Sequence, residues 1–340
     1  MSERTLVITS IAPPTQSMRV LAEGALARGL DLICVGDKKS PPHYELEGVE
    51  FLSLDAQLRS DYRLARSLPT GHYSRKNLGY LRAIEAGAVR ISETDDDNAP
   101  LAAFWQERPL EVTGRMLSRA GWHNPYRYFS DAMVWPRGLP LEAVHEAAAA
   151  ASKPLASGSA HCPVQQDLAN GDTDVDAVYR MTRGELVEFE DRGPLILGER
   201  AWTPFNSQST HWWEEAFELL YLPSYCTFRM TDIWRSFVAQ ACLWPRGWRL
   251  AYRGPSMVQE RNPHNLLRDF EAEVPGYLHN AEIVRRFEAL EMAPGPAGIR
   301  ANLRRCYQAL IEMRLVDAKE LELLEHWFEG IERARARRAG

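Results

Sequence analysis

The sequence has no apolar run approaching about 18 residues, the length that a membrane-spanning helix needs. The first nine residues also lack the long apolar segment of a secretory signal before charged and turn-forming residues appear. From these two absences we expect a protein that is neither secreted nor membrane-spanning, and a cytoplasmic location.

Cysteine is scarce and scattered. The five cysteines, at positions 34, 162, 226, 242 and 306, are odd in number and far apart, and the sequence has no C-x-x-C pair. Disulfide frameworks and structural zinc sites both need closely spaced, paired cysteines. We therefore expect reduced thiols, as in a cytosolic protein.

An excess of positive charge is also missing. The formal net charge is −6, so no general affinity for nucleic acid is expected and we predict no nucleic-acid partner. What remains is an ordinary globular composition, 45% hydrophobic and 25% charged, in a chain of 340 residues that can bury a large core.

Short apolar runs alternate with a helical pattern in the first third of the chain. Residues 5–10, 32–36 and 49–54 are predicted strands, and a helix through residue 28, capped by Ser17, separates the first two. Strands and helices in alternation predict an α/β fold with a mostly parallel sheet, in which ligands lie beyond the carboxyl ends of the strands. Thr9, Ile11 and Asp37 are predicted to lie at that edge.

An acidic stretch follows the strand expected at residues 89–94. Asp95, Asp96 and Asp97 are adjacent carboxylates that repel one another, and a divalent cation reverses this cost because hard cations prefer carboxylate oxygen. Strand alternation would direct Asp95 and Asp97 to the same side, which is the D-x-D pattern of a metal held against a diphosphate. The alternative is a solvated acidic turn that only ends the strand.

A second charged stretch opens the helix expected after Ser74. Ser74 could cap that helix, which would place Arg75, Lys76 and Asn77 in its first turn. Cations there oppose the helix dipole unless an anion such as a diphosphate binds the same terminus. The alternative is that both cationic side chains extend into solvent.

Two further residues are candidates for chemistry. Asp232 is expected as the N-cap of a helix, with Thr231 as the other choice for the cap, and a carboxylate fixed there could also accept a proton. His264 lies in a polar loop, where a single histidine is more often an ordinary surface residue than a metal ligand.

The pattern becomes helical from residue 266 onward, with a break at Pro294-Gly-Pro296. We therefore expect residues 266–340 to form a helical C-terminal extension. It ends in Arg333-Ala-Arg-Ala-Arg-Arg338, where cations at a helix C-terminus are favourable; peripheral contact with a membrane surface is an alternative for this tail.

Several segments together resemble the STELLO-type glycosyltransferases, over residues 5–270 and in the same order. The matching segments are Ile11-Ala-Pro-Pro-Thr15, Val35-Gly-Asp-Lys-Lys39, Ser74-Arg-Lys-Asn-Leu-Gly-Tyr80, Glu93-Thr-Asp-Asp-Asp-Asn98, Asn124-Pro-Tyr126, Trp135-Pro-Arg-Gly138, Asp174-Val-Asp-Ala-Val-Tyr-Arg180, Pro204-Phe-Asn-Ser-Gln208, Asp232-Ile-Trp-Arg-Ser236 and Gln259-Glu-Arg-Asn262. A more distant likeness is to the reversibly glycosylated polypeptides, which are UDP-arabinopyranose mutases. They share the triple aspartate and an aspartate–hydrophobic–tryptophan motif like Asp232-Ile-Trp234.

The resemblance implies a GT-A-like domain over residues 1–265, acting as a metal-dependent glycosyltransferase. The expected donor is a UDP-sugar, with a GDP-sugar second, and the acceptor is a glycan or another small molecule. The alternatives are a nucleotide-sugar mutase and a catalytically idle scaffold that binds sugar nucleotides.

The expected site has three groups of residues. Mn²⁺ or Mg²⁺ would be bound by Asp95, Asp97 and His264, with Asn262 as the substitute for His264, and Asp232 would be the base of an inverting transfer. The predicted nucleotide-binding residues are Thr9, Ile11, Asp37, Arg75, Lys76, Asn77, Asp95 and Asp96.

Overall fold

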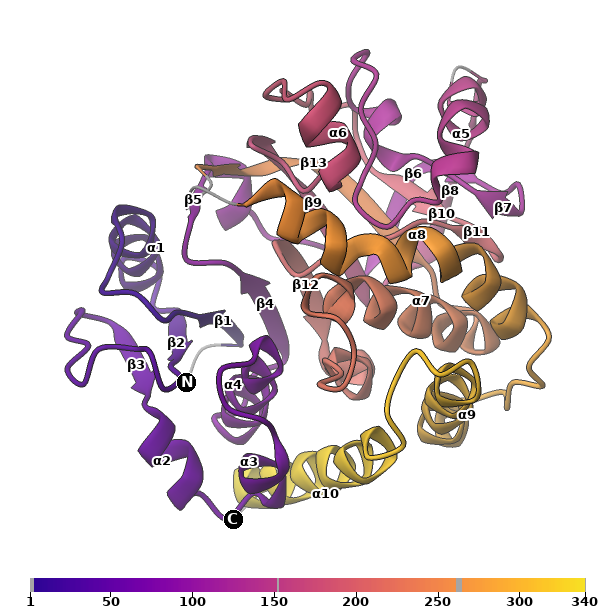
Figure 1. The fold of residues 1–340 in the computed structure, drawn as a ribbon. Coiled ribbons are helices and arrows are strands. Elements are labelled where there is room, and N and C mark those ends of the chain that lie inside the picture. The colour runs from indigo at the N-terminus through magenta and orange to yellow at the C-terminus, as the bar shows by residue number, and fades with distance from the viewer. Residues whose placement is uncertain (1–2, 152, 261–264, 340) are drawn as a thin grey trace.

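The computed structural model describes residues 3–151, 153–260 and 265–339. Eleven strands form one central sheet in the order β3-β2-β1-β4-β12-β9-β13-β10-β6-β8, with β5 paired to β13, and helices surround this sheet (Figure 1). The strands are β1 (Arg4–Thr9), β2 (Asp31–Val35), β3 (Val49–Leu52), β4 (Arg90–Thr94), β5 (Asn98–Pro100), β6 (Glu111–Leu117), β8 (Ala156–His161), β9 (Val164–Gly171), β10 (Leu195–Leu197), β12 (Ser209–Trp213) and β13 (Leu250–Gln259). β7 (Gly121–Trp122) and β11 (Ala201–Trp202) pair separately.

The helices lie between and after these strands. They are α1 (Gln16–Leu26), α2 (Leu54–Arg59), α3 (Arg63–Ser67), α4 (Lys76–Glu85), α5 (Val144–Ala150), α6 (Ala177–Thr182), α7 (Thr231–Leu243), α8 (Leu266–Glu288), α9 (Ile299–Glu312) and α10 (Glu320–Ala339). Short 3₁₀ turns lead into several of them, including Tyr73–Arg75 before α4 and Phe228–Met230 before α7.

Both faces of the N-terminal strands are buried, as expected of a parallel sheet. Alternate residues of β1 enter different cores: Leu6 and Ile8 pack in the cluster that contains α1, and Val7 packs in the cluster that contains α4. This explains why the run is continuously apolar rather than alternating with polar residues.

The expected α/β, GT-A-like architecture is confirmed. β1 pairs in parallel with β2 and β4, and β2 pairs in parallel with β3, so these strands end at one edge of the sheet. Beyond β4 the sheet is mixed, because β12 is antiparallel to both β4 and β9. The edge that ends in Thr9, Val35 and Thr94 is where a ligand site is expected.

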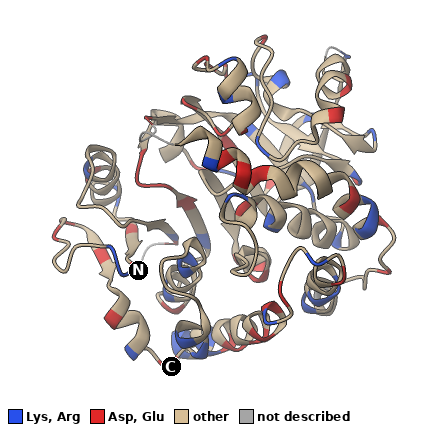
Figure 2. Ribbon diagram, viewed as in Figure 1, with Lys and Arg blue, Asp and Glu red and all other residues tan. Residues whose placement is uncertain are grey.

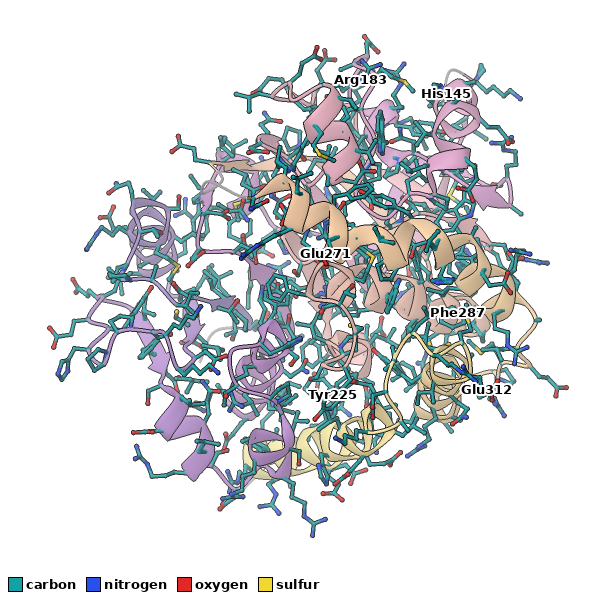
Figure 3. The ribbon with its side chains drawn as sticks, in the orientation of Figure 1. His145, Arg183, Tyr225, Glu271, Phe287 and Glu312 are labelled. Carbon is teal, nitrogen blue, oxygen red and sulfur yellow. The ribbon has the colours of Figure 1, made fainter. Side chains whose placement is uncertain are left out.

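The C-terminal helices share the core of the sheet. Phe287 of α8, Leu303 of α9 and Trp327 of α10 belong to the same buried cluster as Val7 and Ile91 of the sheet. Figure 3 labels Phe287 near the end of α8. The boundary at residues 265 and 266 stays a prediction.

The arginines at the chain end pair with acidic side chains of the preceding structure. Arg335 bonds Glu218 (2.9 Å), Arg337 bonds Glu85 (3.0 Å), and Arg338 bonds Glu214 (3.1 Å). Figure 2 shows this basic end of α10 beside α3 and α4. In the described ranges, no helix is both long and apolar enough to cross a membrane.

Candidate active site

The acidic turn between β4 and β5 is fastened to the loop after β1. Asp96 accepts a hydrogen bond from Ser10 Oγ at 2.5 Å, and its backbone carbonyl accepts one from Thr15 Oγ1 at 2.6 Å. Thr15 also accepts from the backbone N–H of Met18 and so caps α1, the role that the sequence had assigned to Ser17. The loop after β1 thus fixes both a helix start and the acidic turn.

Asp95 lies next to the buried ammonium group of Lys76. Lys76 Nζ donates to the carbonyl of Thr94 (2.8 Å) and to the hydroxyl of Tyr73 (3.0 Å), and it is 3.5 Å from Asp95 Oδ1. Burial raises the pKa of Asp95 to about 7; Lys76 opposes this rise, and the charge of Asp97 adds to it. Negative charge is therefore costly at this turn unless a cation compensates it.

The two carboxylate oxygens of Asp97 differ in their hydrogen bonding. Gln259 Nε2 donates to Asp97 Oδ2 at 3.1 Å, whereas Oδ1 is buried with no hydrogen-bond partner among the residues that the structure describes. Buried polar atoms of this kind are rare and call for an explanation, such as an ion. Within the same residues, no group of three or more His, Cys, Asp or Glu side chains is arranged to hold a metal ion. The predicted ligand His264 and its substitute Asn262 lie outside the described residues.

A cavity of about 360 Å³ opens beside this turn. It is lined by Thr9, Ile11, Tyr73, Asp95, Asp96, Asp97, Arg137, Asp174, Asn206, Ser207, Gln208, Phe228, Arg229, Asp232 and Gln259. Five carboxylates therefore face two guanidinium groups, and Glu273 already pairs with one of these, Arg229 (2.7 Å). The cavity carries excess negative charge. Figure 2 shows acidic residues continuing from β4 into the turn.

Asp232 reaches this cavity, but it does not cap a helix. α7 begins at Thr231 after Met230, with no side-chain cap, so the predicted N-cap role of Asp232 or Thr231 is wrong. The carboxylate of Asp232 instead contacts Arg137 (3.1 and 3.2 Å) and the N–H and hydroxyl of Ser207 (both 3.3 Å). Asp232 is therefore held in the first turn of α7 by long-range contacts.

A second cavity of about 230 Å³ adjoins the first, with Thr9, Ile11, Tyr73, Asp96 and Phe228 lining both. It is further lined by Ser10, Val35, Gly36, Asp37, Lys39, Gly71, His72 and Arg75. The predicted nucleotide-binding residues Thr9, Ile11 and Asp37 thus surround one cavity at the carboxyl ends of β1 and β2. Asp37 also accepts hydrogen bonds from the backbone N–H groups of Lys38 (2.7 Å) and His72 (2.9 Å).

The structure places Arg75 and Asn77 differently from the prediction. The guanidinium of Arg75 is 1% exposed and donates to Gln57 Oε1 (2.7 Å) and to the carbonyls of Leu68 and Ala65 (both 3.2 Å). The side-chain amide of Asn77 exchanges two hydrogen bonds of 2.9 Å with the backbone of Leu222. Arg75 therefore ties the start of α4 to α2 and α3, and Asn77 holds the segment at Leu222. Arg75 also lines the second cavity, and a role of these two residues in nucleotide binding stays a prediction.

The start of α4 also differs from the expected one. Ser74 does not cap α4; its N–H is itself capped by His72 Nδ1 (3.1 Å), and a 3₁₀ turn leads into the helix. Lys76 is fully buried beneath Asp95 rather than exposed at a free helix end. The ammonium group of Lys76 therefore stabilises the acidic turn through the carbonyl of Thr94 and the carboxylate of Asp95.

Several residues of the cavity were not predicted as site residues. Arg137, Asp174, Asn206, Ser207 and Gln259 each belong to a segment on which the family resemblance was based. Those segments are polar loops far apart in sequence. The only signal in the sequence was that these segments resemble motifs of the family. That they line one cavity could not be predicted, because it depends on how the sheet folds.

Comparison with known proteins gives two results. Residues 229–336 match the family model of the STELLO glycosyltransferases, a match that includes Asp232, α7 to α9 and most of α10. Two Arabidopsis thaliana proteins, named "Probable glycosyltransferase STELLO2" and "Probable glycosyltransferase STELLO1", are each 30% identical to this chain, over 275 and 274 residues.

The alignments cover 75% of this chain and 35% of each plant protein, so the chain spans about a third of the length of the relatives it matches. The alignments extend well beyond the part that matches the family model. Together, the two results confirm the expected resemblance to the STELLO-type glycosyltransferases.

Proposed function

We propose that this chain transfers a sugar from a nucleotide-sugar donor to a glycan or another small acceptor, with Mn²⁺ or Mg²⁺ as cofactor. One observation carries the proposal. The acidic turn at Asp95–Asp97 and the separate carboxylate of Asp232 face one cavity, which is continuous with a second cavity at the ends of β1 and β2. The names of the plant relatives point to the same class of reaction.

The two cavities differ in a way that suits the two parts of such a donor. The smaller one is bordered by Ile11, Val35 and Gly36 and by the aromatic side chains of His72, Tyr73 and Phe228, and can accept the flat face of a base. The larger one is lined by carboxylate, amide and guanidinium groups, which can bind sugar hydroxyls. A UDP-sugar is our first choice of donor and a GDP-sugar the second.

The acidic turn fits a divalent cation. Among the described residues, Asp97 Oδ1 is a buried acceptor without a hydrogen-bond partner, and the pKa of Asp95 is raised chiefly by burial, so a bound cation would relieve both costs. Asp95 and Asp97 would hold the metal. Once bound, it would neutralise charge on the departing diphosphate.

Asp232 is proposed as the base. The acceptor oxygen attacks C1 of the sugar while its proton passes to a carboxylate oxygen of Asp232. The bond between C1 and the phosphate oxygen breaks, and its electron pair leaves on the nucleoside diphosphate. Attack opposite the leaving group inverts the configuration at C1.

Calorimetry with UDP, GDP and other nucleotides, each with Mn²⁺, tests the proposal. We expect one nucleotide to bind the native chain and to bind Asp97→Ala at least about tenfold more weakly, because a metal ligand is lost. Asp31→Asn is the matched control, since Asp31 is exposed at the opposite end of β2. If no nucleotide binds, or if Asp97→Ala binds as well as the native chain, the metal-dependent function is excluded.

Product analysis separates the two alternative functions. Incubation with nucleotide sugar and no acceptor would yield a ring-isomerised nucleotide sugar from a mutase. A transferase would yield slow release of nucleoside diphosphate and free sugar, with water as the acceptor. An idle scaffold would bind the nucleotide sugar and leave it unchanged.

A further inference from the structure

Arg137 lies between two carboxylates of the larger cavity and contacts both. Its Nε and Nη2 atoms each donate to Asp174 at 2.8 Å, which makes a bidentate pair. Its Nη1 and Nη2 atoms also donate to the two oxygens of Asp232, at 3.2 and 3.1 Å. One buried guanidinium therefore joins Asp174, in the segment between β9 and α6, to Asp232 on α7.

The two carboxylates are held unequally. Asp174 has the two short bonds from Arg137 and a further one from Asn206 Nδ2 (2.8 Å), and its backbone carbonyl accepts from Tyr126 (3.0 Å). Every hydrogen bond described above for Asp232, from Arg137 and Ser207, is 3.1 Å or longer. Asp174 is thus firmly fixed, whereas Asp232 keeps longer contacts that can yield to another donor.

We propose that Arg137 is a positioning residue which orients Asp232 toward the acceptor, and that Asp174 is the anchor which holds Arg137 in place. This inference rests on the proposed function, in which Asp232 receives the proton of the acceptor. It assigns separate tasks to two carboxylates that line the same cavity.

The charges of Arg137, Asp174 and Asp232 support these separate tasks for the two carboxylates. Asp174 and Asp232 carry −2 together, and Arg137 reduces the sum to −1. Burial alone would lower the pKa of Arg137, but the charges of Asp174 and Asp232 and their hydrogen bonds raise it well above its usual value. Arg137 therefore stays charged, and without it the two carboxylates would repel each other and Asp232 would lose its orientation.

Arg137 also joins the two sides of the cavity. Its Nη1 atom donates to the carbonyl of Arg229, three residues before Asp232, and its backbone N–H donates to the carbonyl of Asp174 (3.1 Å). The segment before α7 and the segment after β9 are thus fixed to the same residue. Movement of Arg137 would displace Asp232 relative to the acidic turn.

A charge-matched pair of variants separates positioning from simple structural support. Arg137→Gln leaves Asp174 and Asp232 without their cation, so we expect a lower thermal midpoint and slower turnover. Adding Asp174→Asn restores the local charge to −1 and leaves Asp232 unchanged. We expect this double variant to regain most of the thermal midpoint but to turn over donor at least about tenfold more slowly than the native chain.

Turnover is measured as release of UDP or GDP from the nucleotide sugar that the native chain hydrolyses, and KM for that donor should change less than about threefold. Arg304→Gln combined with Glu325→Gln is the matched control, because this exposed bidentate pair joins α9 to α10 away from the cavity. Guanidinium ion at millimolar concentration should partly restore turnover to Arg137→Ala with Asp174→Asn, whereas methylammonium should not. Guanidinium offers the planar fork that an ammonium lacks.

The outcomes are distinct. Recovery of stability without recovery of turnover supports the inference. If turnover returns together with stability in the double variant, Arg137 only supports the fold and the inference is overturned. If the native chain binds no nucleotide and releases no UDP or GDP, the proposed function fails and this inference fails with it.

Discussion

At the scale of single residues, Asp232 shows how one side chain can satisfy a local rule and still serve another purpose. An aspartate at the start of a helical pattern is the usual sign of an N-cap. In the fold its carboxylate turns instead to Arg137 and Ser207, which are 95 and 25 residues away in sequence. The local pattern marked the correct residue for an incorrect reason.

Asp232→Asn tests its proposed chemistry. The amide keeps the size of the side chain, and Arg137 keeps its bidentate partner Asp174, so we expect a small loss of stability and unchanged nucleotide affinity. Turnover of donor should fall by about 10²-fold or more, because general base catalysis commonly contributes that much. Proton NMR of the first sugar product reports its anomeric configuration.

Two outcomes would contradict the proposed role of Asp232. Turnover equal to that of the native chain would remove Asp232 from the reaction, and retention of configuration would remove the inverting mechanism. Asp31→Asn, with its exposed carboxylate far from the cavity, should leave both measurements unchanged.

His211 allows a prediction about pH. It is fully buried on β12, between Ser92 (2.7 Å) and Asp167 (3.3 Å), with Arg108 and Arg4 nearby. Burial and the charge of Arg108 lower the pKa of His211 well below its usual value, although Asp167 opposes this. The unfolded chain therefore binds a proton below about pH 6.5 that the folded chain resists, and stability present above that pH is lost as pH falls.

From pH 7 to pH 5 this single group should cost at most about 2 kcal/mol of the free energy of unfolding, a limit set by the unfolded-state pKa of about 6.5. Urea unfolding of the native chain and of His211→Gln measures it. Between pH 7 and pH 5, the free energy of unfolding of the native chain should fall relative to that of His211→Gln by about this cost. His145→Gln, on an exposed histidine, should show no such shift; an equal shift there would assign the effect elsewhere.

At the scale of elements, the start of α10 holds the segment that leads to the cavity. The buried carboxylate of Glu320 accepts hydrogen bonds from Tyr221 Oη (2.5 Å) and from the backbone N–H groups of Ser224 (3.0 Å) and Tyr225 (2.9 Å). Figure 3 labels Tyr225 on this segment. The segment continues to Phe228 and Asp232, so the C-terminal helix supports the cavity indirectly.

Glu320→Ala should therefore destabilise the fold. It leaves the buried N–H of Ser224 and the half-buried N–H of Tyr225 without an acceptor, and a buried group left in this way costs about 1–3 kcal/mol. Urea unfolding measures the effect, and Glu320→Gln should lose less because the amide oxygen still accepts. Glu322→Ala is the matched control on the exposed face of the same helix; an equal loss there would contradict the assignment.

At the scale of the whole molecule, the sequence predicted those parts of the site that depend on residues adjacent in the chain. Thr9, Asp37 and the acidic turn at Asp95–Asp97 could be found because the ends of parallel strands meet at one edge. Arg137 and Asp174 could not be found in this way, because their meeting with Asp232 depends on contacts between segments that are far apart in sequence. The hydrogen bonds of Arg75 to the carbonyls of Leu68 and Ala65 could not be found either, because they depend on how α3 packs against the start of α4.

The sheet and the C-terminal helices share one core and are expected to unfold cooperatively. The larger cavity is lined by residues from Thr9 of β1 to Gln259 of β13, and Phe287 and Trp327 of the C-terminal helices share one core with the sheet. A ligand that binds only the folded chain stabilises it by about 2.7 kcal/mol at 100 times its dissociation constant. We therefore expect UDP with Mn²⁺ to shift the whole thermal transition upward.

Differential scanning calorimetry distinguishes two cases. One transition that moves as a unit would show that residues 266–340 unfold together with the sheet, because the shared core couples them. Two transitions, of which only one responds to UDP with Mn²⁺, would make the C-terminal helices an independent unit. Asp97→Asn provides the control: it should keep the same number of transitions while losing most of the shift, because the amide lacks the negative charge with which Asp97 is proposed to hold the metal.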